Sequence, residues 1–260
     1  MTDAKKYTGK LASTRILIIG GSSGIGFAVA EACLENGATV IISSSQSSRV
    51  ESSVGRLLES YPSAKGRISG HPCDLSSPNL EQNIKKLFEK SGGKLDHIVC
   101  TAGDKLAMGD LKDITLENIQ RAGMVRFNAV LLVGKHAPTY MNPGPSSSIT
   151  LTTGSVSERP NPGWTVVASY AAGLHGMTRN LALDLAPIRV NLISPGMLKT
   201  ELWDGVPKEQ YEQMEKATAA RLPTGRVAGP ESVAEAYLYL MKDENCTGSM
   251  ISSNGGHLLK

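Results

Sequence analysis

The sequence predicts an α/β protein built on a doubly wound parallel sheet, and two observations support this prediction. Short apolar runs that end in small or turn-forming residues recur along the chain, as is typical of buried parallel strands. These runs are 15–20, 38–43, 97–103, 147–153 and 189–196. Helical patterns lie between them, for example 27–37, 79–91 and 124–141. Strands that alternate with helices indicate βαβ units, in which the strands are parallel.

The composition limits the classes of protein to consider. The chain has 260 residues, a net charge of +3, 40% hydrophobic and 20% charged residues. This length suits one large α/β domain, and we expect a lead-in over 1–12 and a single domain over 13–260. The small charge and the absence of a dense basic run argue against nucleic-acid binding. No apolar stretch reaches the roughly 20 residues that span a bilayer, so we expect no membrane association.

The cysteines and the N-terminus indicate the compartment. Cys33, Cys73, Cys100 and Cys246 are far apart and form no CxxC pair. This predicts a reduced protein without a metal site. Residues 1–10 carry charges but no apolar core, unlike a signal peptide. We therefore expect a cytoplasmic enzyme, or a binding protein derived from one.

A glycine-rich turn joins the first predicted strand to the first predicted helix. Gly20, Gly24 and Gly26 give it the spacing GxxxGxG. Glycines at such a turn allow a tight bend, close approach to a pyrophosphate, and close packing of helix on strand. The N-terminus of the following helix supplies N–H donors to phosphates. The turn predicts a dinucleotide site, and the alternative is a turn that needs glycine only for packing.

Several motifs in addition to this turn resemble the short-chain dehydrogenase/reductase family. They are Asp74 after the third strand, Thr-Ala-Gly at 101–103, Ser-Pro-Gly-Met-Leu-Lys-Thr at 194–200 and the glycines that close 247–256. The resemblance extends from about residue 12 to 259 and preserves the order of the motifs. It implies a single-domain Rossmann fold with a seven-stranded parallel sheet. It also implies a small-molecule substrate and assembly as a homo-dimer or homo-tetramer.

The same resemblance assigns the cofactor-binding residues. Those around the pyrophosphate and ribose are Gly20, Ser22, Ser23, Gly24 and Ile25. Those beside the adenine are Asp74 and Leu75, and those along the ribose channel are Ala102 and Gly103. Those that hold the nicotinamide amide are Pro195, Gly196, Met197 and Thr200.

The end of the second strand favours NADP(H) over NAD(H). An NAD-selective enzyme needs a carboxylate there for the ribose 2′-hydroxyl. The chain instead has Ser43-Ser44-Ser45-Gln46, with Arg49 close behind. Ser44, Ser45 and Arg49 offer donors to a 2′-phosphate, and no carboxylate repels it. The alternative is a solvated serine loop that leaves the preference undetermined.

The catalytic positions depart from the family pattern of Asn, Ser, Tyr and Lys. Only Ser155 matches, because Arg126 stands at the asparagine position, Val167 at the tyrosine and Ala171 at the lysine. Tyr170 is a possible displaced acid, but Leu174 stands where its lysine would be. The alternative role for Tyr170 is packing or substrate contact.

A site without this acid suits a cationic substrate. Hydride transfer to an iminium yields a neutral amine directly, whereas an alkoxide must be protonated. Two prolines stiffen the loop around Asn161, and Trp164 can stack on a planar cation. Arg126 can hold a substrate carbonyl, or form an internal ion pair instead. Glu158 is a candidate partner for the substrate or for Arg126.

The arginine, the missing Tyr/Lys pair and the Pro-x-Pro-Gly-Trp loop resemble one fungal branch of the family. It contains the NADPH-dependent reductase/Diels–Alderases of bridged diazaoctane indole alkaloids, of the malbrancheamide and paraherquamide type. Those enzymes use an aspartate between the prolines, where this chain has Asn161. Two interpretations stay open: a relative with different chemistry, or a carboxylate replaced to trap a complex.

The resemblance to this branch implies iminium reduction coupled to a stereoselective intramolecular Diels–Alder cyclisation. The implied catalytic residues are Arg126, Ser155, Asn161 and Trp164, and the implied substrate contacts are Glu158, Val167 and Tyr170. Three alternatives stay open. They are a redox-neutral Mannich-type cyclase with bound NADP, a carbonyl reductase that uses Tyr170, and a non-catalytic NADP-binding protein.

Overall fold

A computed structural model describes residues 6–260. Residues 1–5 of the expected lead-in lie outside this range. The end of the lead-in is part of the packed domain, because Leu11 is only 1% exposed and belongs to the core. The N–H of Ser13 donates to the carbonyl of Gly37 at 3.0 Å, which ties the lead-in to the turn after the first helix.

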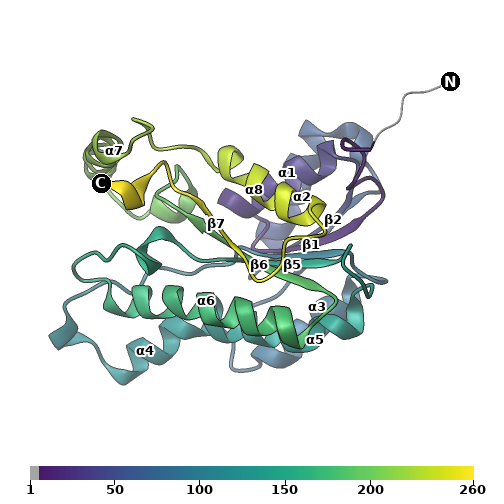
Figure 1. The fold of residues 1–260 in the computed structure, drawn as a ribbon, viewed down its shortest axis with the longest axis horizontal. Helices are drawn as coiled ribbons and strands as arrows, with labels where there is room; N and C mark the ends of the chain where they lie inside the picture. The colour runs from purple at the N-terminus through teal and green to yellow at the C-terminus, as the bar shows by residue number, and fades with distance from the viewer. Residues whose placement is uncertain (1–5) are drawn as a thin grey trace.

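Seven parallel strands form one sheet in the order β3-β2-β1-β4-β5-β6-β7, which confirms the predicted doubly wound Rossmann topology (Figure 1). The strands are β1 (Arg15–Ile19), β2 (Thr39–Ser44), β3 (Ile68–Pro72), β4 (His97–Cys100), β5 (Ser148–Thr152), β6 (Arg189–Pro195) and β7 (Met250–Ser253). Strand β4 is shorter than the predicted run 97–103. Its pairing ends at Cys100 because the next residues leave the sheet as a loop.

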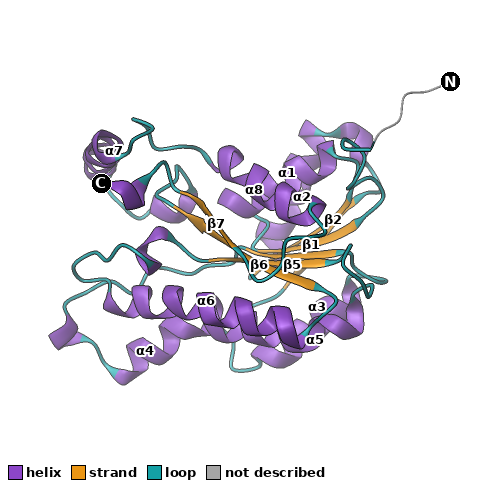
Figure 2. Ribbon diagram, viewed as in Figure 1, coloured by secondary structure: helices purple, strands orange, loops and turns teal. Residues whose placement is uncertain are grey.

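Helices cover both faces of the sheet (Figure 2). One face carries α1 (Gly24–Glu35), α2 (Ser47–Ser60) and α8 (Pro230–Lys242). The other face carries α3 (Leu80–Lys90), α5 (Ala129–Tyr140) and α6 (Thr165–Asp184). Helix α4 (Leu116–Gly123) packs beside α6, and α7 (Lys208–Arg221) lies near the C-terminus. The sheet is therefore a buried middle layer.

Two predicted helices differ in detail from the structure. The predicted helix 124–141 is a π-helical turn at Met124–Asn128 followed by α5. An extra residue in a helical turn shifts the side chains around the axis, and such π-turns are frequent at functional sites. The predicted helix 27–37 already begins at Gly24, because the glycine turn itself winds into α1.

The two faces of the sheet have separate apolar cores. The core under α3, α5 and α6 includes the stacked rings of Phe88 and Tyr140, whose centroids are 5.0 Å apart. The core under α1, α2 and α8 includes Tyr237, which is 0% exposed. The Tyr237 hydroxyl lies 2.7 Å from Thr152 Oγ1, so its polar atom is paired. Together the cores fix where each strand ends.

The four cysteines are free thiols, and three of them are buried. Burial raises the pKa of Cys33 and Cys100 to about 12 and that of Cys73 to about 11, so these thiols are poor nucleophiles. Within residues 6–260 no cluster of three or more His, Cys, Asp or Glu side chains is arranged to hold a metal ion. None of the helices in this range is long and apolar enough to cross a membrane.

Replacing Gly26 with alanine should destabilise the fold. A Cβ there would overlap the carbonyl oxygen of Gly20 and lie 2.5 Å from Thr101 Oγ1. Forcing this overlap should cost about 1–3 kcal/mol, measured as the free energy of unfolding in urea. Gly55→Ala is the matched control, because that position is exposed in α2 and open within 4 Å. The control should be stabilised by about 0.5–1 kcal/mol. Equal effects of the two substitutions would contradict the packing argument.

Candidate active site

The candidate site lies at the carboxyl edge of the sheet. All strands are parallel, so the loops that follow them leave at this edge. The strand order reverses between β1 and β4, and ligands of open α/β sheets bind at such a switch point. The segments that follow β1, β2, β3, β4, β5 and β6 carry most of the predicted site residues.

The glycine turn packs β1, α1 and the loop after β4 against one another. Gly20 has φ +97°, and a Cβ there would overlap the backbone N of Ala102. Gly24 has φ +50°, and its Cβ position lies 3.3 Å from the Thr200 side chain. Packing therefore requires glycine at Gly20 and Gly26. At Gly24 the left-handed backbone favours glycine, and the turn opens toward the loop after β6.

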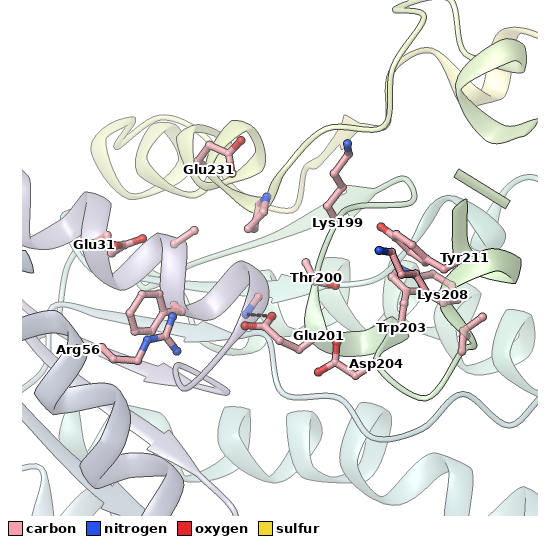
Figure 3. Close-up of a pocket in the computed structure, with 15 residues that line it drawn as sticks. Glu31, Arg56, Lys199, Thr200, Glu201, Trp203, Asp204, Lys208, Tyr211 and Glu231 are labelled. Atoms are coloured by element: carbon pink, nitrogen blue, oxygen red, sulfur yellow. Dashed lines mark hydrogen bonds between the residues drawn. The ribbon is translucent and has the colours of Figure 1, made fainter. Parts of the chain in front are cut away.

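An anionic oxygen already occupies the N-terminus of α1. The N–H of Gly24 donates to Glu201 Oε2 at 2.9 Å, shown as a dashed line in Figure 3. The Ser23 side chain makes no capping hydrogen bond. Free N–H groups and the helix dipole favour negative charge at this end, so the donor set fits a phosphate. A pyrophosphate bound here must displace the Glu201 carboxylate.

A cavity of about 830 Å³ adjoins this turn between α1, α8 and the segment after β6 (Figure 3). Gly24, Thr200 and Glu201 line its inner side. Its remaining wall is rich in charged side chains, among them Glu31, Arg56, Lys199, Asp204, Lys208 and Glu231. None of the predicted catalytic residues lines this cavity. The cavity therefore meets the predicted cofactor residues only at Gly24 and Thr200.

Ser44, one of the residues predicted to select the cofactor, lies beside Ser22 of the glycine turn. Ser22 Oγ donates to Ser44 Oγ at 2.9 Å, and Ser53 Oγ donates to the Ser22 carbonyl at 2.9 Å. Ser45 and Arg49 are exposed next to the N-terminus of α2. Serine hydroxyls and the N-terminus of α2 thus lie at the end of β2, and Arg49 belongs to the first turn of that helix, a donor set that suits a phosphate.

The other cofactor candidates lie on neighbouring loops of this edge. Asp74 Oδ1 accepts hydrogen bonds from the N–H and hydroxyl of Ser76, at 2.9 and 2.7 Å, and Leu75 is buried behind it. The N–H of Gly196 donates to the Ser253 carbonyl at 3.2 Å. Both loops are therefore held by local hydrogen bonds. Ile25, Pro195 and Met197 are buried or half-buried beside them.

Arg126 forms an internal ion pair with Asp104. Its Nε lies 3.1 Å from Asp104 Oδ1, and its Nη2 donates to the Asp104 carbonyl. Burial lowers the pKa of Arg126, and the Asp104 carboxylate partly offsets this. The prediction that Glu158 pairs with Arg126 is wrong, because the carboxylate that contacts Arg126 is that of Asp104, the residue after Gly103. Glu158 is exposed. A Cβ at Gly103 would lie 2.7 Å from Arg126 Nη1, so the guanidinium borders the predicted ribose channel.

Ser155 is buried at the end of β5 and is 7% exposed. It begins a short 3-10 turn, Ser155–Ser157. Its hydroxyl lies 2.9 Å from Nδ1 of His257, a residue of the C-terminal segment. The serine therefore has an imidazole partner that no sequence motif indicated.

The proline-rich loop joins the loop after β4. The N–H of Gly109 donates to the Gly163 carbonyl at 2.9 Å. Trp164, the residue before α6, is half-buried. Its backbone N–H donates to the Asn161 carbonyl at 3.2 Å. Asn161 itself is exposed. The loop is thus anchored at Gly163, while the side chain of Asn161 faces solvent.

Tyr170 packs rather than facing Ser155. Its hydroxyl donates to the Ile119 carbonyl in α4 at 2.9 Å. Its ring lies 5.5 Å from that of Phe127 and against Gly123. Val167 is half-buried one turn earlier on α6. This geometry favours packing over acid catalysis for Tyr170.

Sequence reasoning missed Asp104, Glu201 and His257. Asp104 directly follows the Thr-Ala-Gly motif, and Glu201 directly follows Thr200. His257 follows the paired glycines after the last strand. Each stands just beyond the end of a parallel strand, and this placement was the signal available. Which residue each of these three side chains contacts depends on the path of its loop, which the sequence pattern does not show.

These features define a class of protein. A family model described as an SDR-like Rossmann domain matches residues 7–260. The chain belongs to the short-chain dehydrogenase/reductase family and is an oxidoreductase of that class.

Two fungal proteins are similar over nearly the whole chain. The short-chain dehydrogenase/reductase fsr5 of Gibberella fujikuroi is 47% identical over 100% of both chains. The structure of the MalC reductase/Diels-Alderase from Malbranchea aurantiaca has a TM-score of 0.92 and 41% identity, with 97% of this chain and 99% of that chain covered. A small-chain dehydrogenase solved in complex with NADPH has a TM-score of 0.78 and 29% identity, with 95% and 100% covered. The resemblance to the fungal branch is thereby confirmed.

Glu201→Gln should tighten binding of the predicted dinucleotide. The substitution removes a negative charge that competes with the pyrophosphate for the N-terminus of α1. A charge at a helix terminus is worth roughly 0.3–1 kcal/mol, so the Kd of NADPH and of NADH should fall about two- to fivefold. Calorimetric titration measures this. Asp204→Asn is the matched control, because it removes a charge from the same cavity without touching Gly24. Weaker binding by the Glu201 variant would contradict the assignment.

Proposed function

We propose that this protein reduces an iminium with NADPH and guides the product into a stereoselective intramolecular cyclisation. The observation that carries the proposal is a nucleotide-binding turn beside a site with Val167 and Ala171 at the usual acid and lysine positions. Similarity to the MalC reductase/Diels-Alderase supports the same reaction class. A prenylated indole with a diketopiperazine-like ring would be its small-molecule substrate.

The reduction needs no proton donor from the protein. NADPH, when bound, supplies a hydride, which converts the cationic iminium into a neutral amine. The protein must orient the cation and exclude water, for which apolar side chains such as Val167 and Ala171 are suited. Trp164 offers an aromatic face to a planar cation. Tyr170 is not required, and its hydroxyl is already committed to α4.

Arg126 is prepared to hold a substrate oxygen. Arg126 Nε donates to the Asp104 carboxylate and Arg126 Nη2 donates to the Asp104 carbonyl. Arg126 Nη1 makes no hydrogen bond within residues 6–260. A guanidinium held on one side presents its remaining donors in a defined direction. A carbonyl oxygen of the substrate would accept a charge-assisted hydrogen bond there.

Asn161 has a neutral role in this scheme. An amide neither titrates nor carries charge, so it offers hydrogen bonds without acid–base work. The cycloaddition moves no net proton, so shape and orientation suffice for that step. Glu158, on the same exposed loop, is the nearest carboxylate in sequence for a substrate cation.

The pairing of Ser22 with Ser44, with no carboxylate at the end of β2, supports NADPH as the cofactor. The relative solved with NADPH supports the nicotinamide class. Ser44→Asp should therefore raise the Kd of NADPH by about tenfold or more, because a carboxylate repels the 2′-phosphate. The Kd of NADH should stay the same or fall, since the carboxylate can accept from the 2′-hydroxyl. Fluorescence titration with both nucleotides measures the ratio. An unchanged NADPH:NADH ratio would contradict the proposed selectivity.

Isotope transfer tests the reaction itself. The protein is given NADPH deuterated at the transferable position, together with cyclic indole iminium ions and size-matched ketones. We expect deuterium in amines only, detected by mass spectrometry. Deuterium in alcohols would instead support a carbonyl reductase. If NADPH binds and no label is transferred, the redox-neutral Mannich-type cyclase or a non-catalytic protein replaces the proposal.

Variants separate the proposed roles on a verified iminium. Trp164→Ala and Arg126→Ala should each lower kcat/KM by about tenfold or more, because they remove contacts to the substrate. Tyr170→Phe should stay within about twofold, since it deletes only the hydroxyl that donates to Ile119. A silent Trp164→Ala would show that the proline-rich loop does not contact the substrate.

Three further parts of the proposal concern the molecule as a whole. We infer a domain over 13–260, a cytoplasmic location and a homo-dimer or homo-tetramer. The four widely spaced cysteines without a CxxC pair support a reducing compartment. Light scattering coupled to size exclusion measures the number of subunits.

A further inference from the structure

The C-terminal segment returns to the candidate site after β7. Gly255 and Gly256 have φ +66° and +83°, a conformation that lets the chain reverse. The short 3-10 helix His257–Leu259 follows. His257 Nδ1 then lies 2.9 Å from Ser155 Oγ, although the two residues are 102 positions apart. A histidine from the end of the chain thus contacts the only residue that matches the family's tetrad.

Contacts other than the Ser155 bond hold this histidine in place. Arg159 Nη1 donates to the His257 carbonyl, and the N–H of Gly256 donates to Asn254 Oδ1 at 3.0 Å. A Cβ at Gly256 would lie 2.6 Å from the Pro223 side chain, so the turn is packed closely. The imidazole is therefore positioned by the backbone around it.

The surroundings favour the neutral imidazole. Burial lowers the pKa of His257, and the positive charges of Arg159 and Arg221 lower it further. Arg159 comes from the loop after Ser155–Ser157 and Arg221 from the end of α7. With an ordinary value of about 6.5 lowered in this way, the ring is neutral at pH 7. Its Nδ1 can then accept the hydroxyl hydrogen of Ser155.

We propose that His257 acts through Ser155 as the base that removes a proton from the carbon next to the substrate iminium. The C–H proton moves to Ser155 Oγ while the hydroxyl hydrogen moves to His257 Nδ1. The C–H electron pair becomes the C=C bond, and the C=N electrons return to nitrogen, which gives a neutral enamine. No oxidant or reductant is consumed. Where the iminium is conjugated to a second double bond, this step completes the conjugated diene that a cycloaddition requires.

This inference rests on the proposed iminium substrate, and it assigns that site a second reaction, because a given C=N is either reduced or deprotonated. His257 touches Ser155 rather than the substrate, so it is a positioning residue. Its Nε2 makes no hydrogen bond within residues 6–260, and the residue is half-buried. The imidazolium then returns its Nδ1 proton through Ser155 Oγ to water, which restores the neutral ring with an unprotonated Nδ1.

The tautomer of His257 gives a test that needs no substrate. The full chain is labelled with ¹⁵N-histidine and loaded with NADP⁺, and His257→Asn assigns the resonance. We expect an unprotonated Nδ1 at pH 7 whose shift changes in Ser155→Ala. A protonated Nδ1 would overturn the proposal, because that nitrogen would donate to Ser155 instead of accepting.

Hydrogen exchange tests the step directly. The protein with NADP⁺ and 1-methyl-3,4-dihydro-β-carbolinium is placed in D₂O, and NMR follows deuterium entering the methyl group. General-base catalysis is worth about 10²–10⁴-fold, so His257→Phe and Ser155→Ala should lower the enzymatic exchange rate by about 10²-fold or more. His257→Asn should lower it equally, because an amide keeps a hydrogen bond but takes up no proton. Restored exchange in His257→Asn would assign only a structural role and overturn the proposal.

His175→Phe is the matched control, since this histidine is also bonded to a serine, with Nε2 2.9 Å from Ser157 Oγ. Its exchange rate should stay within about twofold of the unaltered protein. A loss equal to that of His257→Phe, or no exchange by the unaltered protein above the buffer rate, would overturn the proposal.

Deuteride transfer from labelled NADPH to 2-methyl-3,4-dihydro-β-carbolinium, which has no exchangeable hydrogen beside its iminium carbon, tests the proposed reduction separately. Transfer without exchange would leave the reduction standing and remove only the role of His257.

Discussion

The close approach of backbone to backbone at the glycine turn is the constraint on which the site depends. Gly26 lies against the Gly20 carbonyl, and Gly20 lies against the backbone of Ala102. These contacts leave no room for a Cβ, so β1, α1 and the loop after β4 meet at one point. Every other part of the candidate site is placed relative to that point because the strands are parallel and their ends are fixed by two cores.

Charge is arranged differently on the two sides of the site. On the nucleotide side, the N-terminus of α1 already binds the carboxylate of Glu201. An incoming pyrophosphate exchanges one anion for another, and this exchange keeps the helix terminus paired. On the proposed substrate side, Arg126 is held by Asp104. The ion pair fixes a cation beside the ribose channel without adding a proton donor of suitable acidity.

The hydroxyls of Tyr170 and Ser155 have partners that the sequence did not indicate. Tyr170 is committed to α4, and Ser155 is bonded to an imidazole from the end of the chain. Burial lowers the pKa of His257, and the nearby arginines lower it further, so a proton accepted there is readily released. In the proposed scheme, a base without an acid suits a substrate that arrives with a positive charge.

Sequence patterns alone predicted the sheet, the helix layers and the glycine turn. Each of these depends on local periodicity or on a residue type that the backbone geometry demands. The absence of the Tyr/Lys pair was also predicted from the sequence, because it depends on which residues stand at motif positions. The one-residue widening of the helix at Met124–Asn128 was not predicted, because a π-turn has no distinctive periodicity.

The tertiary structure decided which side chains meet. Arg126 pairs with Asp104 instead of Glu158, and the reason is the path of the loop after β4. Glu201 reaches Gly24, and His257 reaches Ser155, across 177 and 102 positions of sequence. Such contacts depend on how loops leave neighbouring strands at one edge of the sheet. The sequence by itself determined the fold and predicted the absence of the Tyr/Lys pair. The packing of distant loops decided which residues contact Arg126, Gly24 and Ser155.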